Sequence, residues 1–283
     1  MIRAATKDDI NGIIALWNEA FGDSEDDIRF FLDNRFEPKN TLVNYIDNEV
    51  VSMLFLLEGD MVIDCESYPS YYLYAACTAK KCRGRGLMAE LLNEAKSLAA
   101  ERNKCFICLM PGEKSLFDFY ARFGYKTVFS RKILKVELSD LPEIENPCNE
   151  LNFSDYSEKR RNGFSKFNRF EWDNMSIDFA CKHHLLYGGK ELNSCNGYLL
   201  YSECESSINV KEFAFPEENF NSALVNLLVR TKSKNAIINL PSDYQVSFGQ
   251  YEIVDSAMAV SLKPEIDCII SGLKNAYLGL TLD

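Results

Sequence analysis

Three stretches in the first half of the chain repeat apolar residues every three or four positions, the spacing of a helix with one buried face. The first follows Thr6, which with Asp9 has the spacing of a capping box, and its apolar face comprises Ile10, Ile13, Ile14, Trp17 and Phe21. The second ends near Asn103, and its apolar face comprises Met88, Leu91, Leu92, Ala95, Leu98 and Ala99. The third is "EKSLFDFYARFG", which Gly124 ends. The pattern predicts three helices.

Strand-sized apolar runs alternate with these helices. They cover residues 40–47, 49–59, 71–78 and 104–110, and one or two closing strands follow at 125–138. The next segment, 139–150, is polar, contains two prolines and lacks periodicity. We therefore expect an α/β protein of two domains, residues 1–138 and 151–283, joined by the linker 139–150.

The second half repeats part of this order. A β-hairpin is predicted at 197–215, a helix at 216–232 and a strand at 235–241. Strand, helix and strand also surround the glycines at 84 and 86, but here the turn reads "PEEN" and has no glycine. The pattern indicates a diverged internal duplication, although a generic α/β unit gives the same order.

Composition narrows the functional classes. The chain has 283 residues, 47% of them apolar, a formal net charge of -11 and a pI near 4.9. This charge argues against a general binder of nucleic acid or anionic membranes and is compatible with a cationic small substrate. The N-terminus lacks the apolar core of a secretory signal, and the longest apolar run, residues 50–57, is too short to span a bilayer. With ten cysteines read as reduced thiols, we expect a cytoplasmic protein.

The stretch "KKCRGRGLMAELL" (80–92) places two glycines between a strand and a helix. Glycine lets a ligand approach the backbone closely, and the first N–H groups of a helix have no partner inside it. Phosphates bind at such turns, and Lys80, Lys81, Arg83 and Arg85 could add positive charge. The alternative is a tight turn with solvated basic side chains. The spacing fits neither a dinucleotide-binding fingerprint nor a P-loop.

Two motifs together resemble the GNAT acyltransferases. Residues 81–86, Lys-Cys-Arg-Gly-Arg-Gly, are similar to the family's [Q/R]-x-x-G-x-[G/A] pyrophosphate loop, with Lys in the first position. A helix, a strand and "FYARFGY" follow, and the last is similar to the family's Tyr-x-x-x-Gly-[Phe/Tyr] signature. The resemblance covers roughly residues 1–137 and implies a GNAT fold, a central mixed sheet flanked by helices, with acetyl-CoA as co-substrate.

The tandem order resembles the Eis-like branch, in which a second, degenerate GNAT-like domain follows the catalytic one. Those proteins carry a third, sterol-carrier-like domain, which a chain of 283 residues is too short to hold. The resemblance implies an N-acetyltransferase acting on a small-molecule or peptide amine. We expect no nucleic-acid or membrane partner and no metal, and a homo-oligomer is compatible with the sequence.

The resemblance also implies a site. Ala76, Cys77 and Thr78 would pair with the pantetheine arm, and Ser115 would contact the cofactor near the thioester. The pyrophosphate would lie against the turn that comprises Arg83, Gly84, Arg85, Gly86, Leu87 and Met88. Tyr120 would protonate the departing CoA thiolate, although a tyrosine among Phe117, Phe119 and Phe123 could also be ordinary core.

The general base is open, because the central strand "YYLYAACT" contains no carboxylate. Glu25 and Asp26 could attract a cationic amine, or simply be solvated acids at a helix start. Trp172 could close the acceptor pocket or pack in the core. In the Eis-like proteins the C-terminal carboxylate reaches the active site, which makes Asp283 a candidate. The apolar segment before it, 276–282, should dock onto the protein.

The cysteines and histidines do not support a metal site or a catalytic triad. Cys105 and Cys108 lie three apart in a strand, so they face opposite sides and are poor zinc ligands. His183 and His184 lack partners at metal or triad spacing. The sequence therefore favours direct acetyl transfer to a primary amine, with a non-catalytic acyl-CoA sensor, or a transferase of longer acyl groups, as the alternatives.

Overall fold

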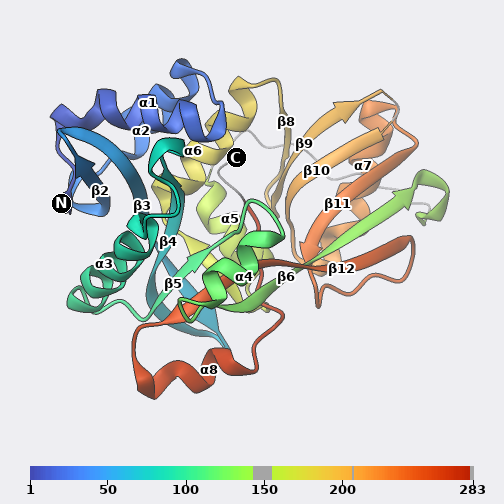
Figure 1. Cartoon of the computed structure of the whole chain (residues 1–283). Helices are drawn as coiled ribbons and strands as arrows, with labels where there is room; N and C mark the ends of the chain where they lie inside the picture. The colour runs from blue at the N-terminus through green and yellow to red at the C-terminus, as the bar shows by residue number, and fades with distance from the viewer. Residues whose placement is uncertain (143–154, 206, 281–283) are drawn as a thin grey trace. The chain divides into compact units, whose positions relative to one another are not determined.

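The computed structural model describes residues 1–142, 155–205 and 207–280, which group into two compact units (Figure 1). Unit 1 comprises Met1–Asp60, Tyr68–Thr127 and Met258–Gly272, and unit 2 comprises Met61–Ser67, Val128–Ala257 and the segment from Leu273 on. Residues 258–272 fall in the second domain that the sequence suggests, but they belong to unit 1. The reason is strand pairing, since Met258–Ser261 pair antiparallel with Phe106–Leu109.

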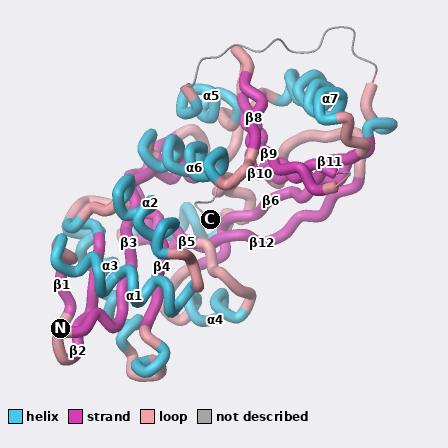
Figure 2. Tube along the Cα trace, turned by 90° about the horizontal axis from the view of Figure 1, so that it is seen from above, coloured by secondary structure: helices cyan, strands magenta, loops and turns pink. Residues whose placement is uncertain are grey.

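Unit 1 is a mixed sheet with helices. Its strand order is β1-β2-β3-β4-β5-β12, with bounds β1 Ile2–Ala4, β2 Thr41–Ile46, β3 Glu49–Ile63, β4 Glu66–Thr78, β5 Phe106–Leu109 and β12 Gln250–Ser261. Its helices are α1 Ile10–Phe21, α2 Glu25–Arg35, α3 Leu87–Glu101, α4 Ser115–Ala121 and α8 Asp267–Ser271. Strands β4 and β5 lie side by side (Figure 2) and pair in parallel. The pairs β1–β2 and β2–β3 are antiparallel. The expected α/β class is confirmed.

The helices and strands expected in the first half are all present. The Asp9 carboxylate accepts the Thr6 N–H at 2.6 Å, and α1 begins at the next residue. Gly124 adopts φ = 85° just beyond α4, the left-handed conformation that glycine permits at a helix end. The run at 125–138 forms a single strand, β6 Lys126–Glu137. Helix α2 is not among the three helices that periodicity predicts, but it begins at Glu25, where the sequence suggests acids at a helix start.

Helix α3 is docked on the sheet of unit 1 by its apolar face. Leu91, Leu92, Ala95 and Ala99 are fully buried, in a cluster that includes Ile107 and Leu109 of β5. Burial of aliphatic side chains at this level is worth about 1.5–3 kcal/mol each for the larger ones. The orientation of α3, and therefore of its first turn, is fixed by this contact.

Strand β4 is irregular near its end. Its pairing with β5 covers Ser70–Tyr72 opposite Phe106–Cys108, whereas β4 itself continues to Thr78. Ala75 has φ = 47°, a left-handed conformation that is rare for a residue with a side chain. An outlier of this kind inside a strand bends it and re-aims the residues that follow. The last residues of β4 thus depart from regular pairing with β5.

Unit 2 contains the remaining strands of this order, with helices. Its strand order is β6-β11-β10-β9-β8, with bounds β8 Lys190–Asn193, β9 Tyr198–Cys204, β10 Ser207–Ala214 and β11 Asn235–Pro241; β7 spans Arg169–Trp172. Its helices are α5 Tyr156–Gly163, α6 Asn174–Leu186 and α7 Phe220–Thr231. The hairpin, helix and strand expected at 197–241 are present, whereas α5, α6, β7 and β8 were not predicted.

Both units contain the same parallel crossover. In unit 1, β4 is followed by a short 3₁₀ turn, by α3 and by the parallel strand β5; in unit 2, β10 is followed by a 3₁₀ turn, by α7 and by the parallel strand β11. The turn of unit 2, Glu217–Asn219, carries the "PEEN" sequence. This supports the internal duplication that the sequence indicates. No helix in the described ranges is long and apolar enough to cross a membrane.

The last described residues are buried in unit 2. Ala276, Tyr277, Leu278 and Leu280 are at most 3% exposed, so the expected docking of this segment is confirmed for these four residues. The Leu278 carbonyl accepts hydrogen bonds from the Arg160 guanidinium at 3.1 Å and from the Trp172 indole at 3.2 Å. Arg160 is itself paired with the buried Glu212, at 2.9 Å. A buried charge pair thus anchors the segment before Asp283.

Asp9 offers a test of the first helix start. Its buried carboxylate accepts from Arg3, Thr6 and Tyr45, and the Arg3 guanidinium holds the pKa of Asp9 far below its usual range. We expect Asp9→Asn to lower the free energy of unfolding by about 2 kcal/mol at pH 7. Because a lowered pKa stabilises only above the unfolded-state pKa, the difference should shrink below about pH 4.

The measurement is urea unfolding at pH 7 and pH 3. The control is Asp8→Asn, which changes an exposed neighbouring carboxylate with no resolved partner. Equal stabilities of the two variants at pH 7 would contradict the role of Asp9.

Candidate active site

The turn before α3 presents backbone N–H groups in an exposed, open position. Gly84 and Gly86 have φ = 76° and 81°, and a Cβ at either residue would meet no atom within 4 Å. The N–H groups of residues 84–88 donate to no acceptor in the described part of the chain, and the first helical bond is that from Glu90 to the Gly86 carbonyl, at 3.1 Å. Such free donors at the positive end of a helix favour an anion.

Three of the basic residues around this turn have different environments. Lys81 forms an exposed ion pair with Glu49, which offsets part of its charge. Arg83 donates through Nε to the carbonyl of Thr78 at 3.1 Å and so ties the turn to the end of β4. Arg85 is exposed, with only a long 3.8 Å contact to Cys82 Sγ. Arg85 is therefore the better placed guanidinium for a bound anion.

The end of β4 is fixed from the neighbouring strand. The buried hydroxyl of Ser52, on β3, donates to the Cys77 carbonyl at 2.9 Å and lies 2.8 Å from the Thr78 hydroxyl. The sequence analysis missed Ser52, because nothing in its local pattern marks a contact across strands. Ala76 and Thr78 are half-buried and Cys77 is buried. These three residues thus follow the bend at Ala75 and lead into the glycine turn.

Tyr120 lies in α4 and is 8% exposed. Its ring packs edge-on against Phe119 and Tyr125, at centroid distances of 5.2 and 5.7 Å. Burial raises the pKa of Tyr120 to about 12, and Cys77 contributes to the shift, which shows that the phenol is near the end of β4. Because this pKa lies well above 7, the phenol is protonated at neutral pH. Its hydroxyl has no hydrogen-bond partner among the described residues.

Ser115, Glu25 and Asp26 lie at helix starts. Ser115 begins α4 and donates to Glu113. Glu25 and Asp26 are exposed in the first turn of α2, where carboxylates are favourable, and Glu25 pairs with Arg29 at 2.7 Å. These positions agree with solvated helix-start acids, and a role in binding an amine stays a prediction.

Trp172 lies in unit 2 and is 2% exposed, with its ring edge-on to Phe170 at 4.8 Å. Its hydrogen bond to the Leu278 carbonyl satisfies the indole N–H, so its surroundings are those of a core residue. Asp283 lies outside the described residues and stays a prediction. Cys105 and Cys108 are buried free thiols, and the described residues contain no group of three or more potential metal ligands.

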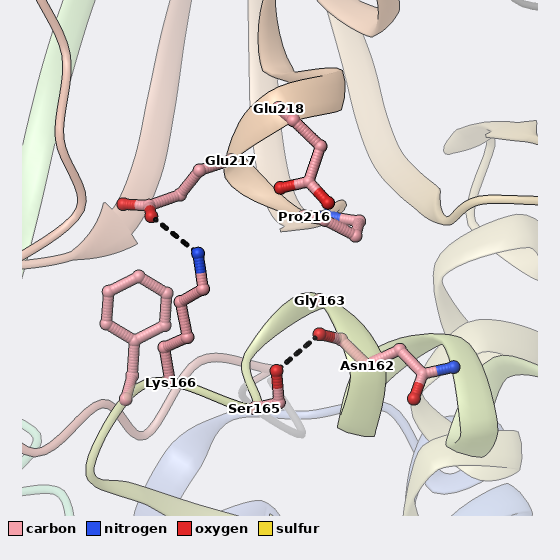
Figure 3. Close-up of a pocket in the computed structure, with 8 residues that line it drawn as sticks. Asn162, Gly163, Ser165, Lys166, Pro216, Glu217 and Glu218 are labelled. Carbon is pink, nitrogen blue, oxygen red and sulfur yellow. Dashed lines mark hydrogen bonds and ion pairs between the residues drawn. The ribbon is translucent and has the colours of Figure 1, made fainter.

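A pocket of about 270 Å³ lies in unit 2, and its lining includes none of the site residues described above (Figure 3). It is lined by Asn162, Gly163, Ser165, Lys166, Phe167, Pro216, Glu217 and Glu218. Glu217 and Glu218 belong to the "PEEN" turn, which takes the place of the glycine turn in the second crossover, and Glu217 pairs with Lys166 at 3.5 Å. The two carboxylates make this turn unfavourable for a phosphate.

The comparison with protein families bears on the N-terminal part of the chain. The model of the acetyltransferase (GNAT) domain matches residues 1–128. The N-terminal part of the chain is a GNAT acetyltransferase domain. It contains the glycine turn, the bent strand β4 and Tyr120, so the resemblance seen in the sequence is confirmed. No curated relative matches the chain by sequence.

Solved structures extend the likeness beyond this GNAT domain. A GCN5-related N-acetyltransferase from Anabaena variabilis has a TM-score of 0.76 at 12% identity, covering 93% of this chain and 73% of that one. Eis1 from Mycobacterium abscessus has a TM-score of 0.73 at 13% identity, covering 93% and 74%. A tandem GNAT protein from the clavulanic acid biosynthesis pathway has a TM-score of 0.52 at 12% identity, covering 93% and 98%. At these identities the shared property is the fold.

The GNAT domain's glycine turn generates a prediction about binding. We expect one acetyl-CoA per chain, with Gly84→Glu and Gly86→Glu each weakening binding by about 100-fold or more, because the carboxylate repels the pyrophosphate. The measurement is isothermal titration with acetyl-CoA.

The matched control is Gly22→Glu, since Gly22 has φ = 82° and the same open space around its Cβ position. This variant imposes the same backbone strain away from the turn and should bind normally. Two equivalent sites per chain, or unchanged binding by both turn variants, would show that the cofactor lies elsewhere.

Proposed function

We propose that the chain transfers an acetyl group from acetyl-CoA to a primary amine by direct attack of the amine on the thioester. The observation that carries this proposal is Tyr120, a buried phenol that is protonated at neutral pH and lies near Cys77. It is supported by the GNAT domain match and by the free N–H groups of the glycine turn. A proton donor and an anion site then flank one end of β4.

The cofactor would lie along β4 and the turn. The N–H groups of residues 84–88 would hold the pyrophosphate, with charge from Arg85 and with Arg83 keeping the turn against Thr78. The backbone of 76–78 would pair with the pantetheine arm, because the bend at Ala75 frees this part of β4 from regular pairing with β5. Ser115, at the start of α4, would lie near the thioester.

Desolvation of the leaving thiolate would favour its protonation by Tyr120. A thiol in water has a pKa near 8.5, about 3.5 units below that of Tyr120, so the transfer would be uphill. Cys77 shows what the same surroundings do to a thiol, since burial raises the pKa of Cys77 to about 12. A CoA thiolate desolvated beside it would be about as basic as the Tyr120 phenolate, which makes the transfer close to neutral.

Cys77 itself is a poor nucleophile. The thiolate is the reactive form of cysteine, and a pKa of about 12 leaves almost none of it at pH 7. This favours direct transfer over an acetyl-cysteine intermediate. The amine nitrogen forms the new C–N bond, the C–S bond breaks, and the sulfur takes the proton of Tyr120, which solvent then restores.

The amine must lose a proton before or during attack, so a base must accept that proton. Glu25 and Asp26 are the carboxylates proposed to attract the amine, and Asp283 is proposed to act through its terminal carboxylate. Trp172 is proposed to border the acceptor. The family resemblance supports Asp283, and the negative charge of Glu25 and Asp26 at a helix start supports attraction of a cationic amine. The burial and hydrogen bond of Trp172 agree with a packing role.

Tyr120→Phe tests the general acid. The variant keeps the ring, so acetyl-CoA affinity should be retained, while turnover should fall roughly 10²–10⁴-fold. The measurement is thiol release from acetyl-CoA with a panel of primary amines, under conditions where chemistry is rate-limiting. Longer acyl-CoA esters in the same assay define the acyl chain.

Tyr125→Phe is the matched control. Tyr125 is a neighbouring, fully buried tyrosine whose hydroxyl has no hydrogen-bond partner among the described residues. Loss of that hydroxyl should leave turnover unchanged. Equal turnover of Tyr120→Phe and the unmodified protein would show that Tyr120 is not the acid. Binding without turnover on any amine would instead favour the acyl-CoA sensor.

A glycine extension tests Asp283. Three glycines added after Asp283 move the α-carboxylate, whereas Asp283→Asn keeps it and removes the side-chain charge. If the α-carboxylate acts, the extension should lower kcat/KM at least about tenfold and Asp283→Asn should not. Unchanged kcat/KM in the extended protein would exclude a catalytic role for the terminal carboxylate.

A further inference from the structure

Lys96 connects α3 to the segment that follows Tyr120. Its ammonium donates to the carbonyl of Phe123, and the nitrogen lies 5.9 Å from the ring centroid of Phe123 and 5.8 Å from that of Tyr125. The side chain is half-buried, and its desolvation lowers the pKa of Lys96. A lysine held in this way is not a solvated surface charge, because it gives up part of its hydration for one carbonyl and two aromatic faces.

The turn that Lys96 contacts is built on the backbone of Tyr120. The Tyr120 carbonyl accepts the N–H of Phe123 at 2.9 Å and that of Tyr125 at 3.3 Å. Gly124 closes the turn in its left-handed conformation. The ammonium is therefore separated from the Tyr120 peptide by a single turn whose geometry is fixed by hydrogen bonds.

Helix α4 depends on contacts of this kind. It has seven residues, and isolated helices shorter than about 12 residues are marginal in water. The Phe123 carbonyl lies just beyond its C-terminal end, where a cation is favourable for the helix dipole. Lys96 therefore stabilises the end of α4 that carries Tyr120.

The other end of this connection is the glycine turn. Lys96 lies on α3, and the free N–H groups of residues 84–88 belong to the glycine turn and to the first two residues of this helix. Because α3 is docked rigidly through Leu91, Leu92 and Ala95, the contact sets the position of Tyr120 relative to the proposed pyrophosphate site. A cofactor that contacts both the glycine turn and Tyr120 requires a constant distance between them.

We propose that Lys96 is a positioning residue for the Tyr120 hydroxyl, which holds the acid at a fixed place relative to the anion site of α3. This rests on the proposed function, in which Tyr120 protonates the leaving thiolate. The contribution of Lys96 to turnover should therefore require the Tyr120 hydroxyl. Loss of the Lys96 ammonium should not affect cofactor binding.

The experiment is a double-mutant cycle with Lys96→Met and Tyr120→Phe. Lys96→Met keeps the length and packing of the side chain but removes the ammonium. We expect it to lower kcat about tenfold, since small displacements of a catalytic group are costly, and to change the acetyl-CoA Kd less than about twofold. In the Tyr120→Phe background the same change should have no further effect on kcat. Lys96→Arg, which restores a cationic donor, should recover most of the loss.

Lys104→Met is the matched control. Lys104 is also a partly buried lysine of unit 1, paired with Glu58 and 4.5 Å from the ring centroid of Tyr71. Its loss should lower the Tm as much as that of Lys96 and leave kcat unchanged. This separates general stability from positioning.

The outcomes distinguish the two proposals. Suppose that Tyr120→Phe lowers kcat and that Lys96→Met lowers kcat by the same factor in the Tyr120→Phe background as in the unmodified protein. Lys96 then does not act through the hydroxyl, and the positioning role is wrong. The same conclusion follows if Lys96→Met weakens acetyl-CoA binding as much as it lowers kcat. If Tyr120→Phe leaves kcat unchanged, the acid assignment itself fails, and the positioning role fails with it.

Discussion

The docking of helix α3 on the sheet of unit 1 is the contact on which the candidate site depends. Its buried leucines and alanines fix the helix axis, and the axis fixes where the glycine turn presents its N–H groups. The left-handed backbone at Gly84 and Gly86 then opens the turn, with nothing beside it that could fill the space. Apolar packing on one side of α3 thus determines the polar geometry at its end.

Desolvation is the second constraint, and it acts on an acid and a thiol alike. Burial raises the pKa of Tyr120 and that of Cys77 to about 12. In the proposed reaction, desolvation of the departing thiolate would raise its basicity and so favour its protonation by the phenol. The apolar residues around Tyr120 would then bear on the proposed chemistry as well as on stability.

The sequence predicted the first half well because its signals are local. Apolar periodicity, the Thr6–Asp9 spacing and Gly124 each act within a few residues, and the structure contains the helices that they indicate. Ser52 and Lys96 could not be found in this way, since each acts on residues 25 or more positions away. The inclusion of 258–272 in unit 1 was missed for the same reason, because strand pairing over about 150 residues leaves no local pattern.

The two crossovers share one backbone arrangement but differ in how well their turns would suit an anion. Both place a 3₁₀ turn and a helix between parallel strands, so both offer a helix N-terminus at the end of a strand. In unit 1 the turn has two left-handed glycines and basic neighbours, whereas in unit 2 it has Pro216 and two glutamates, one of them paired with Lys166. The helix dipole is common to both and cannot by itself specify a phosphate. Close approach to the backbone and the sign of the nearby charge make the difference, and only the turn of unit 1 provides both.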